Sequence, residues 1–202
     1  MGRRGRGRAA AGKRLEALRR ENANDDTGIA AAYYLARIQQ VHSFTPDLSA
    51  AIAGYRALLA AHPDHLYAQL AAPKLALLLL YDDVPAAEWE RRVAEVQALI
   101  PRLTAPEAVR DTRLILATAL IRLRRDHARA YPLLAACLAD GTVARKPHLN
   151  LLLAQAAESA QMLGKTAEAA VFYANFLEEF PHDQKSDEIR RRLDGLKKEV
   201  GP

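Results

Sequence analysis

Residues 163–181 read LGKTAEAAVFYANFLEEFP, and this stretch decides the fold. Its small and apolar residues recur at i, i+4, i+7 and i+8, the spacing that places side chains on one face of a helix. These residues are Ala169, Tyr173, Phe176 and Leu177. Pro181 follows, and a proline disfavours the helical conformation of the residue before it. The stretch therefore predicts an amphipathic helix with a defined end.

The same pattern occurs 118 residues earlier in the chain. The earlier copy comprises Ala51, Tyr55, Leu58, Leu59 and Pro63. Two weaker copies lie between them, at Trp89, Val93, Val96 and Pro101 and at Ala130, Leu134, Cys137 and Leu138. The four copies are spaced by 38, 41 and 39 residues, which is a period typical of helical hairpins stacked in an α-solenoid.

The composition also favours helices throughout the chain. Half of the 202 residues are hydrophobic and only 6% are aromatic, and alanine and leucine outnumber valine and isoleucine, which excludes an all-β fold. Helical periodicity between turn signals predicts nine helices. They span residues 27–43, 47–61, 65–81, 85–102, 105–124, 126–139, 145–163, 165–180 and 184–199.

Segment 150–182 resembles a tetratricopeptide repeat (TPR), which is a hairpin of two helices. The resemblance rests on Ala157 in the first helix, Leu163-Gly164-Lys165 at the turn, Glu168-Ala169 at the start of the second helix, Tyr173 and Pro181. Segment 32–63 resembles the same repeat through Ala51, Tyr55 and His62-Pro63-Asp64. The two middle hairpins are degenerate and longer than the family's 34 residues. A HEAT-type repeat is therefore the alternative, although it would not explain the prolines or the Leu-Gly-Lys turn.

The resemblance implies an all-α fold, a right-handed α-solenoid of about four helical hairpins over residues 25–202. In such a stack each hairpin covers the next, so the last repeat needs a helix with one polar side as a lid. The helix expected at 184–199 fits this role, with Ile189, Leu193 and Leu196 turned inward. We expect it to be the C-terminal cap.

The net charge of +5 is concentrated at the N-terminus. Residues 1–20 hold eight Lys/Arg against one Glu, while the remaining residues hold 21 Lys/Arg and 23 Asp/Glu. Because this Gly/Arg-rich segment lacks residues to bury, we expect residues 1–24 to be a disordered basic tail, with at most a frayed helix at 14–20. Its arginines suggest an alternative function as a nucleic-acid-associated adaptor, through Arg3, Arg4, Arg6 and Arg8.

The sequence predicts no catalytic residue, metal site or cofactor. His62 and His65 flank Pro63-Asp64, but a zinc site needs three or four convergent ligands. Cys137, the single cysteine, aligns with core positions of the sibling repeats, so we expect a buried hydrophobe and not a nucleophile. We therefore predict that the chain is not an enzyme.

The longest apolar run, at residues 75–81, is far shorter than the roughly 20 residues of a membrane-spanning helix. The N-terminus also lacks the apolar region of a secretory signal. As written, the chain is expected to be cytoplasmic, and a periplasmic form would need a leader that is not present here.

The TPR resemblance implies that the chain is a scaffold. Such a scaffold binds a peptide or protein in a concave groove that is lined by the first helix of each hairpin. The expected groove residues are Tyr33, Ala36, Gln40, Lys74, Arg113, Ala117, Leu151, Ala154, Glu158 and Gln161. Chaperone-binding members of the family hold a terminal carboxylate with Lys and Asn, where this chain has Ala36 and Gln40. That class of partner is therefore disfavoured.

Overall fold

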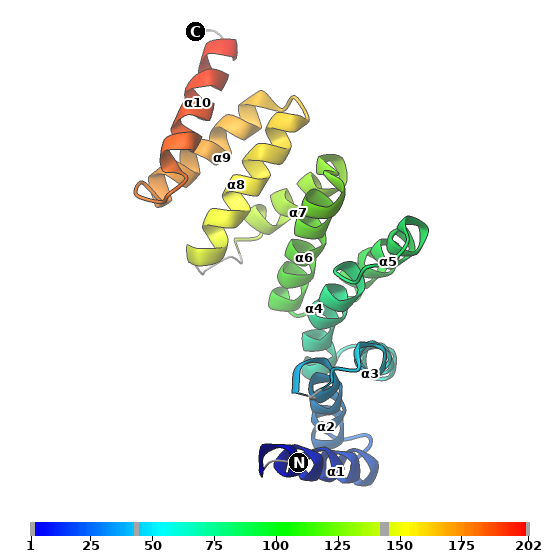
Figure 1. Ribbon diagram of the computed structural model, residues 1–202. Helices are drawn as coiled ribbons and strands as arrows, with labels where there is room; N and C mark the ends of the chain where they lie inside the picture. Colours follow the sequence, from blue (N-terminus) through cyan, green and yellow to red (C-terminus); the bar gives the residue numbers. More distant parts are fainter. Residues whose placement is uncertain (1–2, 43–44, 142–145, 201–202) are drawn as a thin grey trace. The chain divides into compact units, whose positions relative to one another are not determined.

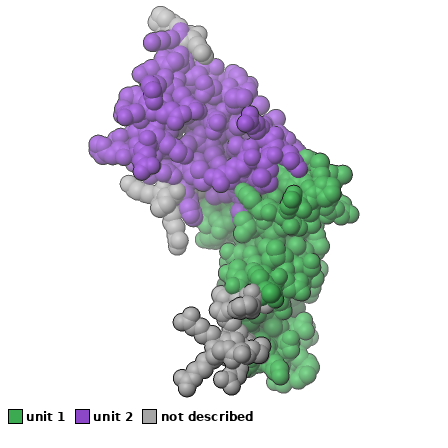
Figure 2. Space-filling view, in the orientation of Figure 1, with its two compact units in different colours: residues 1–112 green, residues 113–202 purple. Residues whose placement is uncertain are grey.

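The computed structural model describes residues 3–42, 45–141 and 146–200, and these residues form ten α-helices and no strand (Figure 1). The chain divides into two compact units, Met1–Thr112 and Arg113–Pro202, called unit 1 and unit 2 (Figure 2). The all-α prediction is confirmed for the described part of the chain. The boundary between the two units falls within one helix, α6.

Unit 1 contains five helices and the start of a sixth. They are α1 (Arg3–Glu21), α2 (Asp26–Arg37) with a π-helical extension (Ile38–His42), α3 (Leu48–Ala61), α4 (Leu66–Leu80), α5 (Ala86–Leu99) with a 3₁₀ turn (Ile100–Arg102), and α6 (Pro106–Arg124). Unit 2 holds the rest of α6 together with α7 (His127–Ala139), α8 (Lys146–Met162), α9 (Thr166–Glu179) and α10 (Ser186–Val200). All nine predicted helices are confirmed, and their ends lie within two residues of the expected ones when the π-helical and 3₁₀ extensions are counted.

Helix α1 corrects the expectation of a disordered tail, because Arg3–Glu21 is helical and packs against α2. Leu15 and Leu18 lie three residues apart and are both partly buried. The turn between the helices is tight, since a Cβ atom on Gly28 would lie 1.7 Å from the backbone oxygen of Asn22. The Gly/Arg-rich composition of the segment did not indicate that these two leucines would be partly buried.

The repeated positions form the core of both units. Ala51, Tyr55 and Leu58 in α3 and their counterparts Ala169, Tyr173 and Phe176 in α9 are all buried. Gly54 brings α3 close to α2, because a Cβ atom at this position would lie 3.0 Å from the Cβ atom of Ala36. Cys137 is buried as expected. The sequence repeat is therefore a repeat of packing contacts.

Helix α10 closes unit 2, as predicted. Its inward side chains, Ile189, Leu193 and Leu196, join a buried cluster that also contains Tyr173 and Phe176 of α9. The charged residues of the opposite face, Arg190, Arg191, Lys197 and Lys198, are exposed. Helix α10 thus has the apolar inner side and polar outer side of a capping helix.

The start of α6 is capped by a buried glutamine from α4. The Gln69 side-chain oxygen accepts hydrogen bonds from the backbone N–H groups of Thr104 and Ala105, at 2.9 and 3.1 Å. Its amide nitrogen donates to the carbonyl of Pro63. Thr104 and Ala105 directly precede α6. Gln69 therefore satisfies backbone N–H groups at the entry to α6, as the second partner of a capping box does.

We expect the Gln69→Leu substitution to lower the free energy of unfolding by about 2 kcal/mol, because it leaves two backbone N–H groups without their acceptor. Urea unfolding followed by circular dichroism measures the change. Gln97→Leu is the matched control, since Gln97 is exposed on α5 and the same substitution should change stability by less than about 0.5 kcal/mol. Equal effects of the two substitutions would contradict the capping role.

Candidate functional site

Helix α4 exposes a row of large apolar side chains. Four of them recur along one side of the helix: Leu66, Leu70, Leu77 and Tyr81, which are 61%, 38%, 41% and 44% exposed. Lys74 lies in the middle of the row and is half-buried. The opposite side of α4 is fully buried, at Ala72, Leu75 and Leu79 among others. We call the exposed row, at positions 66, 70, 74, 77 and 81, the α4 stripe.

Tyrosines from α2 and α4 extend the α4 stripe. Tyr34 is 48% exposed, and its ring centroid lies 5.9 Å from that of Tyr67. The ring of Tyr33 packs against both of these rings. Its centroid lies 5.4 Å from that of Tyr34 and 5.5 Å from that of Tyr67. Burial raises the pKa of Tyr33. The α4 stripe, Tyr34 and Tyr67 together form what we call the α2–α4 surface, which offers both aliphatic and aromatic contacts.

His65 fixes one end of this surface. As the N-cap of α4, its Nδ1 accepts a hydrogen bond from the backbone N–H of Tyr67 at 3.2 Å. Its Nε2 lies 3.1 Å from the Asp26 Oδ1 atom, and its ring stacks on that of Tyr67 at 5.8 Å. Asp26 is itself exposed, so a negative charge borders the aromatic end. His65 is thus engaged in capping and stacking.

The groove residues expected in α2 are buried, and the residues that directly follow two of them are exposed. Tyr33, Ala36 and Gln40 are buried, whereas Tyr34 and Val41, the next residues along, are exposed. Gln40 is held inside, because its Oε1 accepts hydrogen bonds from the Tyr55 hydroxyl and the Arg37 Nη1, both at 2.8 Å. The predicted face is the one that α2 turns toward α3, so these three residues belong to the core.

The expected groove residues of α4 and α6 lie in different surroundings. Lys74 lies in the α4 stripe, with apolar neighbours on both sides along the helix. Arg113 is half-buried and forms an ion pair with Asp140, with 2.6 Å between Nη1 and Oδ2. Ala117 is fully buried. Neighbouring side chains cover Ala117, and its contact with a partner stays a prediction.

The structure brings the four expected residues of α8 onto one face of that helix in unit 2. Leu151, Glu158 and Gln161 are exposed and Ala154 is partly buried. Gln161 also accepts a hydrogen bond from the Tyr173 hydroxyl at 3.0 Å. The participation of this face in binding stays a prediction.

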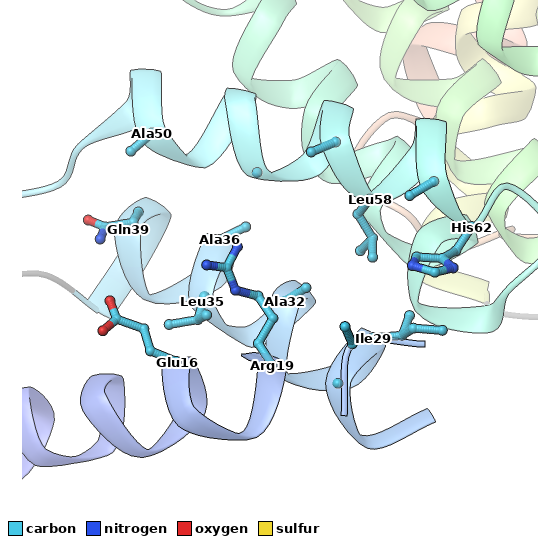
Figure 3. A pocket seen from close by; sticks show the side chains of 15 residues that line it. Glu16, Arg19, Ile29, Ala32, Leu35, Ala36, Gln39, Ala50, Leu58 and His62 are labelled. Carbon is cyan, nitrogen blue, oxygen red and sulfur yellow. The ribbon is translucent and has the colours of Figure 1, made fainter. Parts of the chain in front are cut away.

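A cavity of about 370 Å³ lies between α1, α2 and α3 in unit 1 (Figure 3). Small and aliphatic side chains form most of its wall, including Ala32, Ala57 and Leu58. The polar side chains of Glu16 and Arg19 from α1 also line it. Sequence reasoning missed the cavity, because it placed the residues of α1 that form one wall in a disordered tail with at most a frayed helix.

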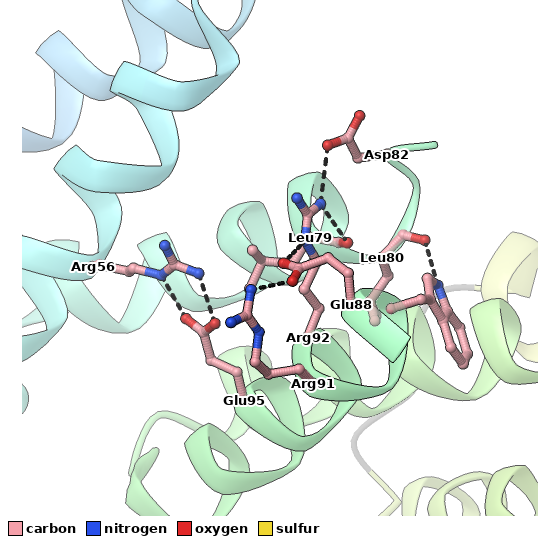
Figure 4. A network of polar contacts seen from close by, with 9 residues as sticks. Arg56, Leu79, Leu80, Asp82, Glu88, Arg91, Arg92 and Glu95 are labelled. Carbon is pink, nitrogen blue, oxygen red and sulfur yellow. Dashed lines mark hydrogen bonds and ion pairs between the residues drawn. The ribbon is translucent and has the colours of Figure 1, made fainter. Parts of the chain in front are cut away.

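An ion-pair network ties α3, α4 and α5 together (Figure 4). Arg56 makes a two-pronged contact with the Glu95 carboxylate, at 2.6 and 2.7 Å. Arg92 bonds Glu88 and Asp82, both at 3.0 Å, and donates to the carbonyl of Leu79. The Arg92 guanidinium lowers the pKa of Glu88. The charges pair with one another, so this network connects the three helices.

Within the described residues, no group of three or more His, Cys, Asp and Glu side chains is placed to hold a metal ion. In the same part of the chain, no helix is both long enough and apolar enough to cross a membrane.

Comparison with known proteins supports the fold. No protein-family model matches the chain, and a search of curated proteins finds no match. Among solved structures, the chain is similar to a thermophilic TPR protein of Thermus thermophilus, with a TM-score of 0.50 and 20% sequence identity. The similarity covers 94% of this chain and 90% of that one. The chain therefore has the all-α helical-repeat fold of a TPR protein, as the sequence predicted.

Proposed function

We propose that this chain, built on the helical-repeat fold of TPR proteins, is a non-catalytic scaffold that binds a segment of a protein partner on the α2–α4 surface. One observation carries the proposal: the α4 stripe leaves three leucines and a tyrosine exposed along a single helix. Contiguous apolar surface of this kind typically marks an interaction site. Leucine side chains cannot donate or accept a proton, so the exposed leucines are suited to binding and not to chemistry.

The dimensions of the surface define the partner segment. The 15 residues of α4 extend over about 22 Å, which matches six or seven residues of an extended peptide or four turns of a helix. Tyr34 and Tyr67 provide rigid rings at one end, and such rings are frequent anchors of interfaces. Lys74 and Asp26 add one positive and one negative charge. The segment we infer is apolar, with a carboxylate near its middle and a cation near one end.

The structure also supports the view that a chaperone-type carboxylate clamp is disfavoured. Ala36 is buried, and the Gln40 side chain already binds Tyr55 and Arg37. A peptide carboxylate could reach neither residue without breaking core contacts. We include the α8 face, at Leu151, Ala154, Glu158 and Gln161, as a second contact region in unit 2.

Selection from a displayed peptide library tests the proposal. Peptides that bind the full chain are selected, and their affinities are compared for the wild type and a Leu70→Ser/Leu77→Ser variant. Each exposed leucine that a peptide covers contributes about 1.5 kcal/mol, so we expect at least tenfold weaker binding by the variant. The enriched peptides should be rich in leucine and aromatic residues.

The matched control is Met162→Ser/Val171→Ser, which removes two exposed apolar side chains from α8 and α9. This control should bind the selected peptides as the wild type does. Peptides that bind the Leu70→Ser/Leu77→Ser variant with full affinity would show that the α2–α4 surface is not the binding site. Circular dichroism verifies that both variants remain folded.

A further inference from the structure

Helix α1 carries an unusual share of the positive charge. Eight of the 29 Lys/Arg residues of the chain fall in residues 3–20, with Glu16 and Glu21 as the acidic residues of the helix. Seven of the eight are arginines: Arg3, Arg4, Arg6, Arg8, Arg14, Arg19 and Arg20. The rest of the chain has a slight excess of acidic residues, so this charge belongs to one element.

The attachment of α1 to α2 directs part of this charge to solvent. Leu15 and Leu18 are partly buried against the unit, and the Asn22 side chain donates to the Leu18 carbonyl at 3.0 Å. On other sides of the helix, Lys13, Arg14 and Arg20 are exposed. Arg20 has a weak ion pair with Glu21 at 3.8 Å, between two well-exposed side chains. These cations are held on a folded frame and need little ordering to bind an anion.

Positions 13 and 20 each carry a cation and are seven residues apart. Seven residues are nearly two helical turns and rise by about 10.5 Å, so these two positions lie on one side of α1. The full helix of 19 residues is about 28 Å long, which is comparable to eight base pairs of a nucleic-acid duplex. A series of phosphates along a duplex can therefore follow this side of the helix.

The chemistry favours phosphate over other anionic surfaces. Arginine binds phosphate oxygens in a two-pronged geometry, and α1 has seven arginines to one lysine. Insertion into a lipid surface needs an exposed apolar face, but the leucines of α1 are turned toward the protein. The helix also has no aromatic residue on which an unpaired base could stack.

We infer that α1 is a binding site for the phosphate backbone of nucleic acid, independent of the α2–α4 surface and without sequence preference. The exposed residues Lys13, Arg14 and Arg20 form this site. In contrast to a mobile tail, the folded helix presents its charges at fixed spacing, which lowers the entropic cost of binding.

The test is the binding of the full chain to a short fluorescent DNA duplex, measured by anisotropy over a series of salt concentrations. The test variant is Lys13→Glu/Arg14→Glu/Arg20→Glu. The matched control, Arg191→Glu/Lys197→Glu/Lys198→Glu on α10, makes the same change in net charge at exposed positions. Circular dichroism compares the helix content of all three proteins.

We expect the wild type to bind duplexes of unrelated sequence equally and the α1 variant to bind at least tenfold more weakly. The slope of log affinity against log salt should also fall by about three, one for each lost phosphate contact. The α10 control should keep most of the affinity and the full slope.

Three results would overturn the inference. The first is equal weakening by the α10 control, which would indicate a general effect of net charge. The second is no binding of the wild type to the duplex at low salt. The third is tighter binding to phosphatidylserine vesicles than to the duplex, which would make α1 a membrane-surface helix. None of these results depends on whether the α2–α4 surface binds a peptide.

Discussion

Trp89→Ala is expected to lower the free energy of unfolding of unit 1 by about 4 kcal/mol, in the range measured for removal of large buried aromatic side chains. Trp89 is almost completely buried in α5. It occupies the position where the other repeats have Ala51, Ala130 and Ala169. The indole is far larger than an alanine side chain, so its removal leaves a large cavity.

The indole also makes a hydrogen bond that alanine cannot replace. The Trp89 Nε1–H donates to the Leu80 carbonyl at 3.0 Å and thereby ties the start of α5 to the end of α4 (Figure 4). Denaturant unfolding followed by far-UV circular dichroism measures the loss, because the variant has no tryptophan left for fluorescence.

Trp89→Phe separates packing from hydrogen bonding. The phenyl ring retains much of the packing, so we expect a loss of about 2 kcal/mol. A cost below about 1 kcal/mol for Trp89→Ala would mean that α5 collapses onto α4 as closely as in the alanine-containing repeats.

The second large effect is expected from Leu193→Asp in α10. Leu193 is buried in the core cluster of unit 2, together with Phe176 and Leu196. An aspartate there would place an unpaired carboxylate among apolar side chains, at a cost of about 3–5 kcal/mol. We expect α10 to detach from α9 and expose the core of the last repeat.

Limited proteolysis and denaturant unfolding detect this detachment. Lys197→Asp is the control, because it introduces the same side chain on the exposed side of α10. It should leave both the cleavage pattern and the unfolding midpoint nearly unchanged. Equal resistance of the Leu193→Asp variant and the wild type would show that α10 does not protect the core of unit 2.

The helices were predictable because their signals are local. Asp25, Asp47 and Asp126 each accept hydrogen bonds from backbone N–H groups at the first turn of the following helix, as aspartate at such positions commonly does. The spacing of Ala169, Tyr173 and Phe176 likewise depends only on the geometry of one helix. These features required no knowledge of which helices are neighbours.

The candidate binding surface was less predictable, as α2 illustrates. The repeat alignment placed Tyr33, Ala36 and Gln40 outward, one residue from the exposed Tyr34 and Val41. A shift of one residue rotates a side chain by about 100° around a helix, which is enough to exchange core and surface. The resemblance of segment 32–63 to the repeat rests on residues 51–64, so it does not fix the register of α2 to one residue.

Helix α4 shows why the helices could be predicted from the sequence and the exposed surface could not. Its sequence, LYAQLAAPKLALLLL, is apolar on every side, so helical periodicity does not distinguish the leucines that are buried from those that are exposed. By itself the sequence determined the helices, the repeated core and the capping helix, since each depends on spacing within one segment. Only the tertiary structure decided that Leu70 and Leu77 face outward and that α1 folds onto α2, because burial depends on which neighbours cover each face.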